Sequence, residues 1–259
     1  MRLNIYPVLS FFLFSALIAG MSACAPVDSD DVKTSGMRAA FTVEANGDGK
    51  SYVEAELTLG DSSFTNSLEL VNGDALLATA NGETKLMRED KKLFSDITYK
   101  VDFPIDTENT AFKIALDRPD GKNAPNSSVT LPAPVTITSP AAGATFHRDD
   151  MLTLSWTPAS NNMTELQIGH VSSRCTDTLG EQVITSTKVN DALLSSDPGS
   201  IERQASVFLP PFTRQDPQAS CVVDIEVRRR RIGTVDPNIG EGGYFYADWY
   251  DWVQVTILP

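Results

Sequence analysis

Few residues in this 259-residue chain have types and spacings that could support catalysis. Ser62 could act as a nucleophile only if a base lay within hydrogen-bond reach of its hydroxyl. The chain has two histidines, His147 and His170, and both belong to its second half. It contains neither the phosphate-binding pattern GxxxxGK(S/T) nor the nucleophile pattern GxSxG. The sequence therefore predicts that the protein is not an enzyme.

Two short segments resemble functional sites of known families. Gly60-Asp61-Ser62 resembles the nucleophile segment of certain serine hydrolases, but no Asp-x-x-His motif follows late in the chain. A serine hydrolase that uses Ser62 is therefore only the second alternative. Residues 44–56 resemble a calcium-binding loop, but Ala55 stands at the twelfth position, where a bidentate carboxylate is required. A hairpin turn is the better interpretation, and no metal or cofactor is expected.

The first 23 residues have the features of a signal peptide. Arg2 gives a positive start, residues 6–20 (YPVLSFFLFSALIAG) form an apolar centre, and Ser22 and Ala23 are small enough for a peptidase to accommodate. The apolar run is shorter than the roughly 20 residues that a permanent membrane helix needs. We therefore expect residues 1–23 to be removed.

The tetrapeptide Met21-Ser22-Ala23-Cys24 resembles the lipobox of bacterial lipoproteins, although Met21 replaces the usual leucine. The resemblance implies acylation of Cys24, which would hold the mature protein in a lipid bilayer through two or three acyl chains. Ala25, in place of Asp, implies by the same resemblance a destination in the outer membrane of the bacterial envelope. The alternative is an ordinary secretory peptide that is cleaved near here without lipid.

Once Cys24 is assigned to lipid, two cysteines remain. In an exported protein they would meet oxidising conditions, so a disulfide between Cys175 and Cys221 is predicted. Closing a loop of this size would contribute on the order of 4 kcal/mol in the chain-entropy model. The alternative is two separate buried thiols. A metal site is disfavoured because the chain has no CxxC pair and its histidines are isolated.

Composition limits the classes of partner. Hydrophobic residues make up 41% of the chain, which is enough for one or more cores, and the formal net charge is -13. Nucleic acids and anionic membrane surfaces attract proteins with a positive face, so this charge disfavours both. Residues 24–36 (CAPVDSDDVKTSG) are small and acidic and show no apolar period, which predicts a flexible tether of about 20 Å root-mean-square length.

From Met37 onward the apolar residues alternate with period two. In Ser51–Leu59 (SYVEAELTL), Val53, Ala55 and Leu57 fall on one side and polar residues on the other. Further strands are expected at residues 39–45, 67–71, 75–80, 97–103 and 111–116, and at residues 135–140, 144–146, 152–156, 165–170, 181–187, 204–209, 221–232 and 249–258. Short strands separated by turns such as Asn81-Gly82 predict an all-β fold of antiparallel sandwiches.

A change in composition predicts a domain boundary. Residues 117–128 are polar and rich in turn formers, and residues 131–134 (LPAP) are stiff. We therefore expect two β-sandwich domains, at residues 37–131 and 132–259. The segment from Val135 to Trp156 resembles the opening of bacterial immunoglobulin-like or fibronectin-like modules, which implies a sandwich but no activity. Trp156 is expected in the core rather than on a ligand platform.

Residues 228–231 form the single basic run of this acidic chain. On a strand, Arg228 and Arg230 would project from one face and Arg229 and Arg231 from the other. The favoured interpretation is an edge strand or hairpin whose arginines pair with acidic neighbours. The alternative is that the guanidinium groups bind phosphate or carboxylate groups of lipopolysaccharide or an acidic glycan.

An aromatic segment, residues 244–252 (YFYADWYDW), follows a glycine-rich loop. Burial against the arginine stems is the favoured interpretation, and stacking on sugar rings or on a protein partner is the alternative. The candidate binding residues are Arg228, Arg230, Tyr244, Tyr246, Trp249 and Trp252. The sequence thus predicts a lipid-anchored, non-catalytic binding or structural module of the cell envelope, whose partner is an unidentified envelope protein or glycan.

Overall fold

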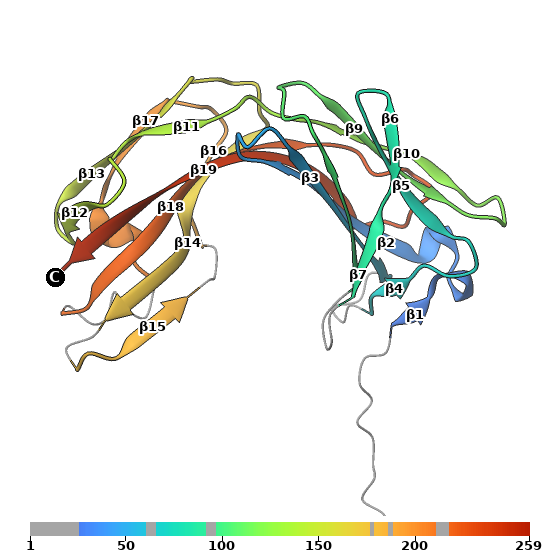
Figure 1. Ribbon diagram of the computed structural model, residues 1–259, viewed down its shortest axis with the longest axis horizontal. Coiled ribbons are helices and arrows are strands. Elements are labelled where there is room, and N and C mark those ends of the chain that lie inside the picture. The colour runs from blue at the N-terminus through green and yellow to red at the C-terminus, as the bar shows by residue number, and fades with distance from the viewer. Residues whose placement is uncertain (1–25, 61–65, 92–96, 177–178, 186–188, 211–217) are drawn as a thin grey trace, which may run out of the picture.

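The computed structural model describes residues 26–60, 66–91, 97–176, 179–185, 189–210 and 218–259. These residues form an all-β protein in the shape of an arch (Figure 1). No helix among them is long and apolar enough to span a membrane. The expected all-β fold class is therefore confirmed.

The strands follow in chain order. They are β1 (Val27–Asp28), β2 (Met37–Ala45), β3 (Ser51–Leu59), β4 (Leu68–Glu69), β5 (Ala75–Ala80), β6 (Glu83–Leu86), β7 (Arg88–Lys91), β8 (Ile97–Phe103), β9 (Ala111–Asp117), β10 (Ala124–Thr130), β11 (Thr136–Ser139), β12 (Ala144–His147), β13 (Met151–Thr157), β14 (Glu165–Thr176), β15 (Gln182–Thr185), β16 (Val189–Leu194), β17 (Ser200–Gln204), β18 (Ser220–Ile232) and β19 (Tyr244–Leu258). Three short 3-10 helices, η1 (Ser29–Asp31), η2 (Thr34–Gly36) and η3 (Ala205–Phe208), lie between them.

One long sheet runs through the whole arch. Its order is β15-β14-β18-β19-β2-β3-β8-β7, with β16 paired to β14 and β12 paired to β19. Strand β19 pairs along its length with β18, and its first part pairs in parallel with β2, from Tyr244 opposite Ala40 to Trp249 opposite Ala45. The sheet is therefore continuous across residue 131. Strand β19 comes from the second predicted domain and lies beside β2, a strand of the first. The division into two domains at residue 131 stays a prediction.

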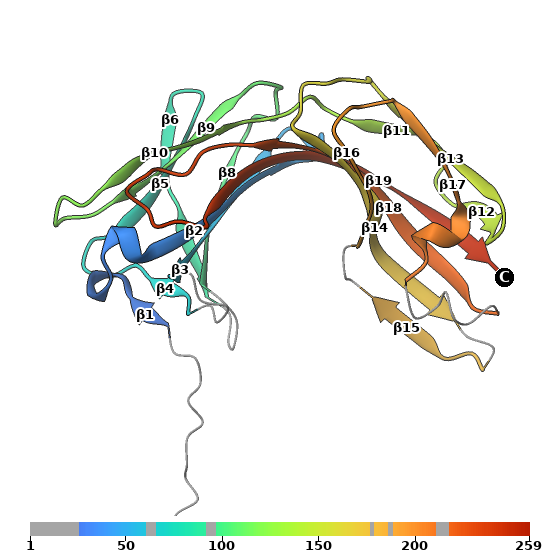
Figure 2. The same ribbon diagram turned by 180° about the vertical axis from the view of Figure 1, so that it is seen from behind.

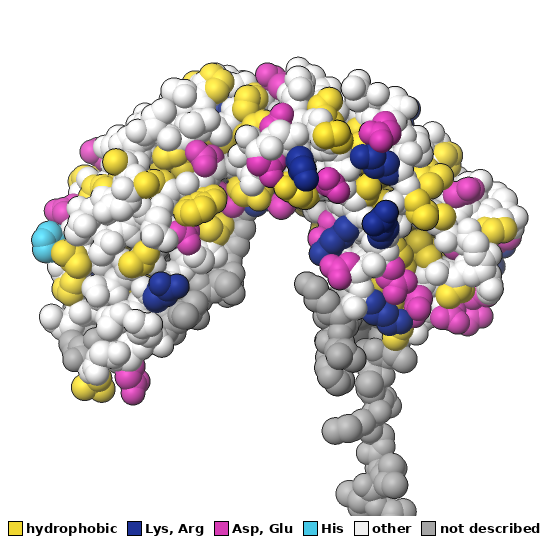
Figure 3. All heavy atoms as spheres, viewed as in Figure 1, with side chains coloured by type: hydrophobic (Ala, Val, Ile, Leu, Met, Phe, Trp, Pro, Cys, Tyr) yellow, Lys and Arg dark blue, Asp and Glu magenta, His cyan; other side chains and the backbone are white. Residues whose placement is uncertain are grey.

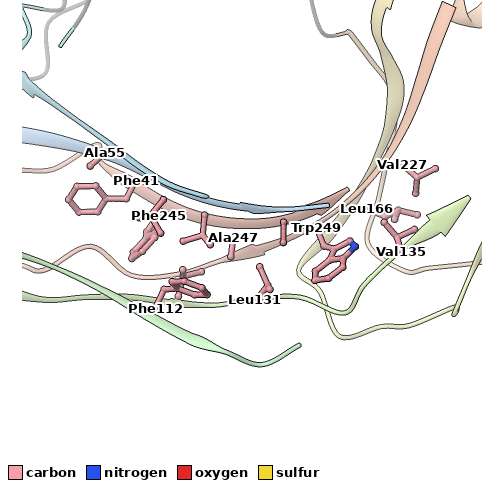
Figure 4. Close-up of a cluster of buried hydrophobic side chains, with 14 of the residues drawn as sticks. Phe41, Ala55, Phe112, Leu131, Val135, Leu166, Val227, Phe245, Ala247 and Trp249 are labelled. Atoms are coloured by element: carbon pink, nitrogen blue, oxygen red, sulfur yellow. The ribbon is translucent and has the colours of Figure 1, made fainter. Parts of the chain in front are cut away.

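Two smaller sheets cover the convex face of the long sheet. Their orders are β10-β9-β5-β6 and β11-β13-β17, and both views place them above β19, β18 and β2 (Figures 1 and 2). The core fills the space between these layers (Figure 4). There the Phe41 and Phe245 rings meet edge to face with centroids 5.5 Å apart. Burying a side chain of this size contributes about 1.5–3 kcal/mol.

Several segments differ from the sequence-based expectation: β6, β7, β16 and β17 were not expected, and the strand expected at residues 67–71 is only β4. Two further differences have a physical reason. Residues 124–128, expected in a polar boundary, belong to β10, which pairs with β9 and in which the buried Ser127 accepts a hydrogen bond from the Asp236 amide at 2.9 Å. A buried polar group that is satisfied in this way leaves no apolar alternation to detect. The strand expected at residues 204–209 is mostly η3, in which Ala205 and Phe208 are buried together.

The tether expected at residues 24–36 is folded from Val27 onward. Strand β1 pairs with β4, and the buried Arg118 donates hydrogen bonds to the Ser29 and Val32 carbonyls at 2.8 Å. Arg118 also forms an ion pair with Asp74, whose side chain is 6% exposed, at 3.1 Å. These long-range partners fix a segment that its own composition would leave as a coil. The expectation of a free coil is therefore corrected for residues 27–36.

Candidate binding surface on the concave face

The described strands place no second layer on the concave face of the long sheet (Figures 1 and 2). Because side chains alternate along a strand, the even-numbered residues of β19 point to this face and the odd-numbered ones into the core. Tyr244, Tyr246 and Tyr250 are half-buried there, and Trp252 is 54% exposed. The arch also stays open between its two legs when all atoms are drawn (Figure 3). We call this open side the concave face.

Strand register brings five side chains into one row across the concave face. Glu165 on β14 lies opposite Arg230 on β18, which lies opposite Asp248 on β19. Asp248 in turn lies opposite Glu44 on β2, which lies opposite Tyr52 on β3. This row combines segments that are far apart in the sequence, so the long sheet itself positions the site.

Arg228 is the centre of a network of carboxylates on this face. Its Nη1 donates to Glu44 Oε1 at 2.6 Å and to Asp248 Oδ2 at 2.5 Å, and its Nε donates to Glu226 Oε1 at 2.8 Å. Burial alone would lower the pKa of Arg228, but the bond to Glu226 and the charges of the three carboxylates outweigh it, so the pKa is raised. The guanidinium stays charged and its charge is compensated locally.

Arg230 is held by the same acidic group. Its Nε and Nη2 donate to the two oxygens of Asp248, each at 2.8 Å, and its Nη1 lies 3.7 Å from Glu165 Oε1. A bidentate pair of this kind is geometrically specific. Burial lowers the pKa of Arg230, but the bonds and charge of Asp248 outweigh this effect and raise it. Neither guanidinium is therefore presented to solvent as an unpaired cation.

The arginines also order the neighbouring rings. The Arg228 guanidinium carbon lies 4.6 Å from the centroid of the Tyr250 ring, and that of Arg230 lies 4.3 Å from the centroid of Tyr246. Tyr246 also stacks on Tyr244, with centroids 4.5 Å apart. Cation–π contacts of this kind stabilise a fixed ring orientation. The result is a row of pre-positioned aromatic rings along β19.

A hollow of about 420 Å³ continues this surface over β2, β3, β7 and β8. Tyr52, 43% exposed, stands in it and donates from its hydroxyl to Asp48 Oδ2 at 2.6 Å. This hydrogen bond, with a smaller effect of burial, raises the pKa of Tyr52. The lining residues are Thr42, Glu44, Tyr52, Val53, Glu54, Arg88, Glu89, Asp90, Lys100, Val101 and Asp102. Carboxylates outnumber cations among them.

The structure divides the candidate residues between two faces. Arg228, Arg230, Tyr244, Tyr246 and Trp252 lie together on the concave face. Trp249 does not: it is 6% exposed and packs into the core at the junction of the two halves (Figure 4). It is therefore removed from the candidate binding residues.

The arginine run behaves in part as expected. The alternation of faces is confirmed, since Arg229 faces away from Arg228 and forms a buried ion pair with Asp197. Pairing with acidic neighbours is confirmed for Arg228, Arg229 and Arg230, whereas Arg231 donates to the Thr130 hydroxyl at 2.6 Å. The edge position is wrong, because β18 lies between β14 and β19 inside the sheet. Interior arginines on a sheet need carboxylate partners, and adjacent strands supply them here.

The predicted disulfide between Cys175 and Cys221 is present. The two cysteines are directly opposite each other on β14 and β18, and both are buried. Trp156 is also buried, and its indole nitrogen donates to Asp197 Oδ1 at 2.8 Å, which confirms its core position. Cys24, the expected lipidation site, lies outside the described residues.

The residues considered for catalysis are not brought together as a site. Ser62 lies outside the described residues. His147 ends β12 at a turn, where its amide donates to Asp150, whereas His170 is fully buried within β14. Residues 46–50 form the hairpin loop between β2 and β3 that the sequence predicted in place of a calcium site. In the part of the chain that the structure describes, no cluster of His, Cys, Asp or Glu could hold a metal ion.

Several residues of the concave face were missed from the sequence. Glu44 and Tyr52 join the site only through the parallel pairing of β2 with β19, which leaves no local pattern. Glu226, Asp248 and Tyr250 join it through the antiparallel register of β18 with β19. One signal was available in the glycine-rich loop before β19. A Cβ at Gly243 would lie 2.7 Å from the Ala39 carbonyl oxygen, so this glycine marks a close approach to another strand.

Comparisons with known proteins yield only remote likenesses. No family model matches the chain, and no curated protein matches it. Among solved structures, the fibronectin(III)-like modules of Clostridium thermocellum CbhA share 14% identity at a TM-score of 0.23, covering 85% of this chain and 90% of that one. DIP-gamma IG1+IG2 shares 10% identity at a TM-score of 0.21, covering 85% of this chain and 97% of that one.

A third likeness is to SGBP-B of Bacteroides ovatus, solved in complex with a mixed-linkage heptasaccharide. It shares 12% identity at a TM-score of 0.19, covering 98% of this chain and 70% of that one. All three TM-scores are low, so the description of the fold rests on the strand pairing of this chain itself.

Proposed function

We propose that this protein is a lipid-anchored, non-catalytic protein of the bacterial cell envelope that binds a neutral carbohydrate chain on its concave face. One observation carries the proposal: the rings of Tyr52, Tyr246, Tyr250 and Trp252 occupy one open sheet face beside a dense row of polar groups. The lipobox at Cys24 supports the anchor and the outer-membrane location.

The chemistry of the surface suits a sugar. The apolar C–H face of a pyranose ring packs on an aromatic ring, whose face carries partial negative charge. Its hydroxyl groups both donate and accept hydrogen bonds. Carboxylates such as Glu44 and Asp48 lie next to the rings and can accept hydrogen bonds from hydroxyl groups. Aromatic rings and hydrogen-bond acceptors therefore lie side by side on this face, as binding of a sugar chain requires.

The charge of the surface favours a neutral sugar chain over an acidic one. Arg228 and Arg230 face four carboxylates, those of Glu44, Glu165, Glu226 and Asp248. An anionic group would have to displace a carboxylate that is already bonded, and would meet a net negative surface. We therefore replace the acidic glycan considered from the sequence with a neutral one.

Binding of a panel of neutral and acidic oligosaccharides, measured by calorimetry on a soluble Cys24→Ser protein, tests this proposal. Trp252→Ala and Tyr250→Ala should each weaken binding about fivefold, the effect of ~1 kcal/mol. The matched control is Met151→Ala, because Met151 is 56% exposed on β13 in the covering layer. Affinity should change little with added salt, since no net charge is neutralised.

Three outcomes would contradict the proposal. Equal losses in Trp252→Ala and Met151→Ala would show that the concave face has no special part in binding. Binding of acidic sugars only, weakening steeply with salt, would show that the arginines are released to bind anions. A panel with no bound sugar would remove carbohydrate as the ligand class.

A further inference from the structure

The folded N-terminal segment fixes where the chain leaves the body. Strand β1 begins at Val27 and lies at the end of one leg of the arch, on the side to which the concave face opens (Figures 1 and 2). Val71 donates from its amide to the Ser29 hydroxyl at 3.1 Å, and Arg118 holds the Ser29 and Val32 carbonyls. The exit point is therefore part of the rigid body and not of a free coil.

The distance from this exit to the proposed anchor is short. Only Ala25 and Pro26 separate Cys24 from Val27. Three residue steps span at most about 11 Å when fully extended. A tether of a dozen residues would let the body rotate freely above the bilayer, whereas this short connection holds one leg at the level of the lipid headgroups.

The other leg ends in an exposed apolar residue on the same side. The start of β15 lies at the end of this leg (Figure 1), and Leu179, three residues before it, is 83% exposed. It is the most exposed large hydrophobic residue among those that the structure describes. An apolar side chain at such a place gains free energy by entering the interfacial region of a bilayer.

We propose that both legs rest on the membrane, so that the concave face is turned toward the bilayer and the carbohydrate it binds is the neutral headgroup of a glycolipid in that membrane. This inference rests on the proposed lipid anchor and carbohydrate ligand. Asp28, Asp30 and Asp31 lie beside the exit point, so the bilayer surface that fits is one without net negative charge.

A matched pair of tryptophan variants tests the orientation. The full-length, acylated protein is placed in phosphatidylcholine vesicles whose acyl chains carry bromine, which quenches tryptophan on contact. The background is the wild-type protein, which keeps the exposed Trp252 of the binding surface, and its own quenching is subtracted from that of each variant. Leu179→Trp should lose most of its added fluorescence. Glu83→Trp should lose none, because exposed Glu83 begins β6 at the turn that rises on the convex side (Figure 1).

A lengthened connection provides the second measurement. Inserting about 20 Gly/Ser residues between Pro26 and Val27 adds a coil of about 25 Å root-mean-square length. This insertion should restore the fluorescence of Leu179→Trp while the protein remains bound to the vesicles. Unchanged quenching would overturn the role of the short connection.

The last arm adds a neutral glycolipid to the vesicles. Quenching of Leu179→Trp should deepen, and the Tyr250→Ala variant should show no such change. No response to any neutral glycolipid would overturn the assigned ligand. Equal quenching of the two tryptophan variants would overturn the orientation. Failure of the wild-type protein to associate with vesicles at all would instead reject the lipid anchor, so the two proposals fail separately.

Discussion

Arg229 and Asp197 form an ion pair inside the protein, with Nε 2.9 Å from Oδ2 and both side chains fully buried. Asp197 also accepts hydrogen bonds from the Trp156 indole and the Gly199 amide, each at 2.8 Å. Arg229 also donates to the Pro134 and Pro158 carbonyls. The pair therefore connects β18 of the long sheet to the segments that contain Pro134, Pro158 and Asp197, which flank the strands of the covering sheet.

Removing one partner of this pair should be costly. Asp197→Asn leaves the Arg229 charge buried without a counter-charge, which typically costs about 3–5 kcal/mol. The free energy of unfolding in urea should fall by that amount. The control is Glu69→Gln at the exposed pair of Lys91 and Glu69, 2.6 Å apart, where ~0–1 kcal/mol is expected. Equal losses would contradict the structural role of the buried pair.

The Asp197 carboxylate should also make the free energy of unfolding fall in acid. Burial raises the pKa of Asp197, but hydrogen bonds from Gly199, Ser160 and Trp156 and the charge of Arg229 outweigh it, so the pKa is lowered. The unfolded value is about 3.9. The stabilisation is therefore present above that pH and is lost as pH falls through the lower folded pKa. Unfolding measured at several pH values should show wild type and Asp197→Asn converging in acid.

The disulfide should contribute strongly to stability. Cys175 and Cys221 are 46 residues apart in sequence, and cross-linking them restricts the unfolded chain by about 4 kcal/mol in the chain-entropy model. The double variant Cys175→Ala/Cys221→Ala should unfold at correspondingly lower urea. Wild type under strong reductant should match it, and the double variant should not respond to reductant. If complete reduction of the disulfide left the urea unfolding of the wild-type protein unchanged, the prediction would be wrong.

Phe245→Ala should destabilise both halves together. Phe245 is buried on β19 against Phe41, and the large cavity left by truncation typically costs about 3–5 kcal/mol. Because β19 pairs with both β18 and β2, the far-UV circular dichroism and tryptophan fluorescence transitions should coincide and shift together. Two separate transitions, only one of them shifted, would instead support independent domains divided at residue 131.

Arg118→Met should release the N-terminal segment. The change removes the hydrogen bonds to Ser29 and Val32 and leaves the Asp74 carboxylate buried without its partner. Trypsin cleaves after lysine, and Lys33 lies between η1 and η2. Cleavage there should be at least about tenfold faster in the variant, which corresponds to ~1.4 kcal/mol of lost local stability. Equal rates would show that the segment is already open in wild type.

Sequence reasoning succeeded where burial is one-sided and local. The alternation in β2 and β3 predicted both strands because one face of each is packed and the other is solvated. The same reasoning placed Arg228 and Arg229 on opposite faces. It could not decide whether the odd or the even residues of β19 enter the core, because both sets contain aromatic rings. The contact of Phe245 with Phe41 decides that question, and only the folded sheet reveals it.

Contacts between distant segments explain the remaining differences. Ser127 and Arg118 are polar residues whose partners, Asp236 and Ser29, lie about a hundred residues away in the chain. Their burial therefore carries no local signature. The candidate site has the same character, since Glu44 meets Arg228 only because β19 connects their strands. Composition located the aromatic segment but not the sheet face that completes it.

The parallel pairing of β2 and β19 also has a mechanical consequence. A pull between an anchored N-terminus and a ligand held near the far part of β19 would act along both strands, in opposite directions. The hydrogen bonds that join residues 244–249 of β19 to residues 40–45 of β2 lie across that direction, so they would be loaded together in shear rather than broken one after another.

 The ladder that carries this load runs from Tyr244 to Trp249 on β19 and from Ala40 to Ala45 on β2. Such a ladder would resist a force that separates the N-terminal segment from the far part of β19, because its hydrogen bonds would have to break together.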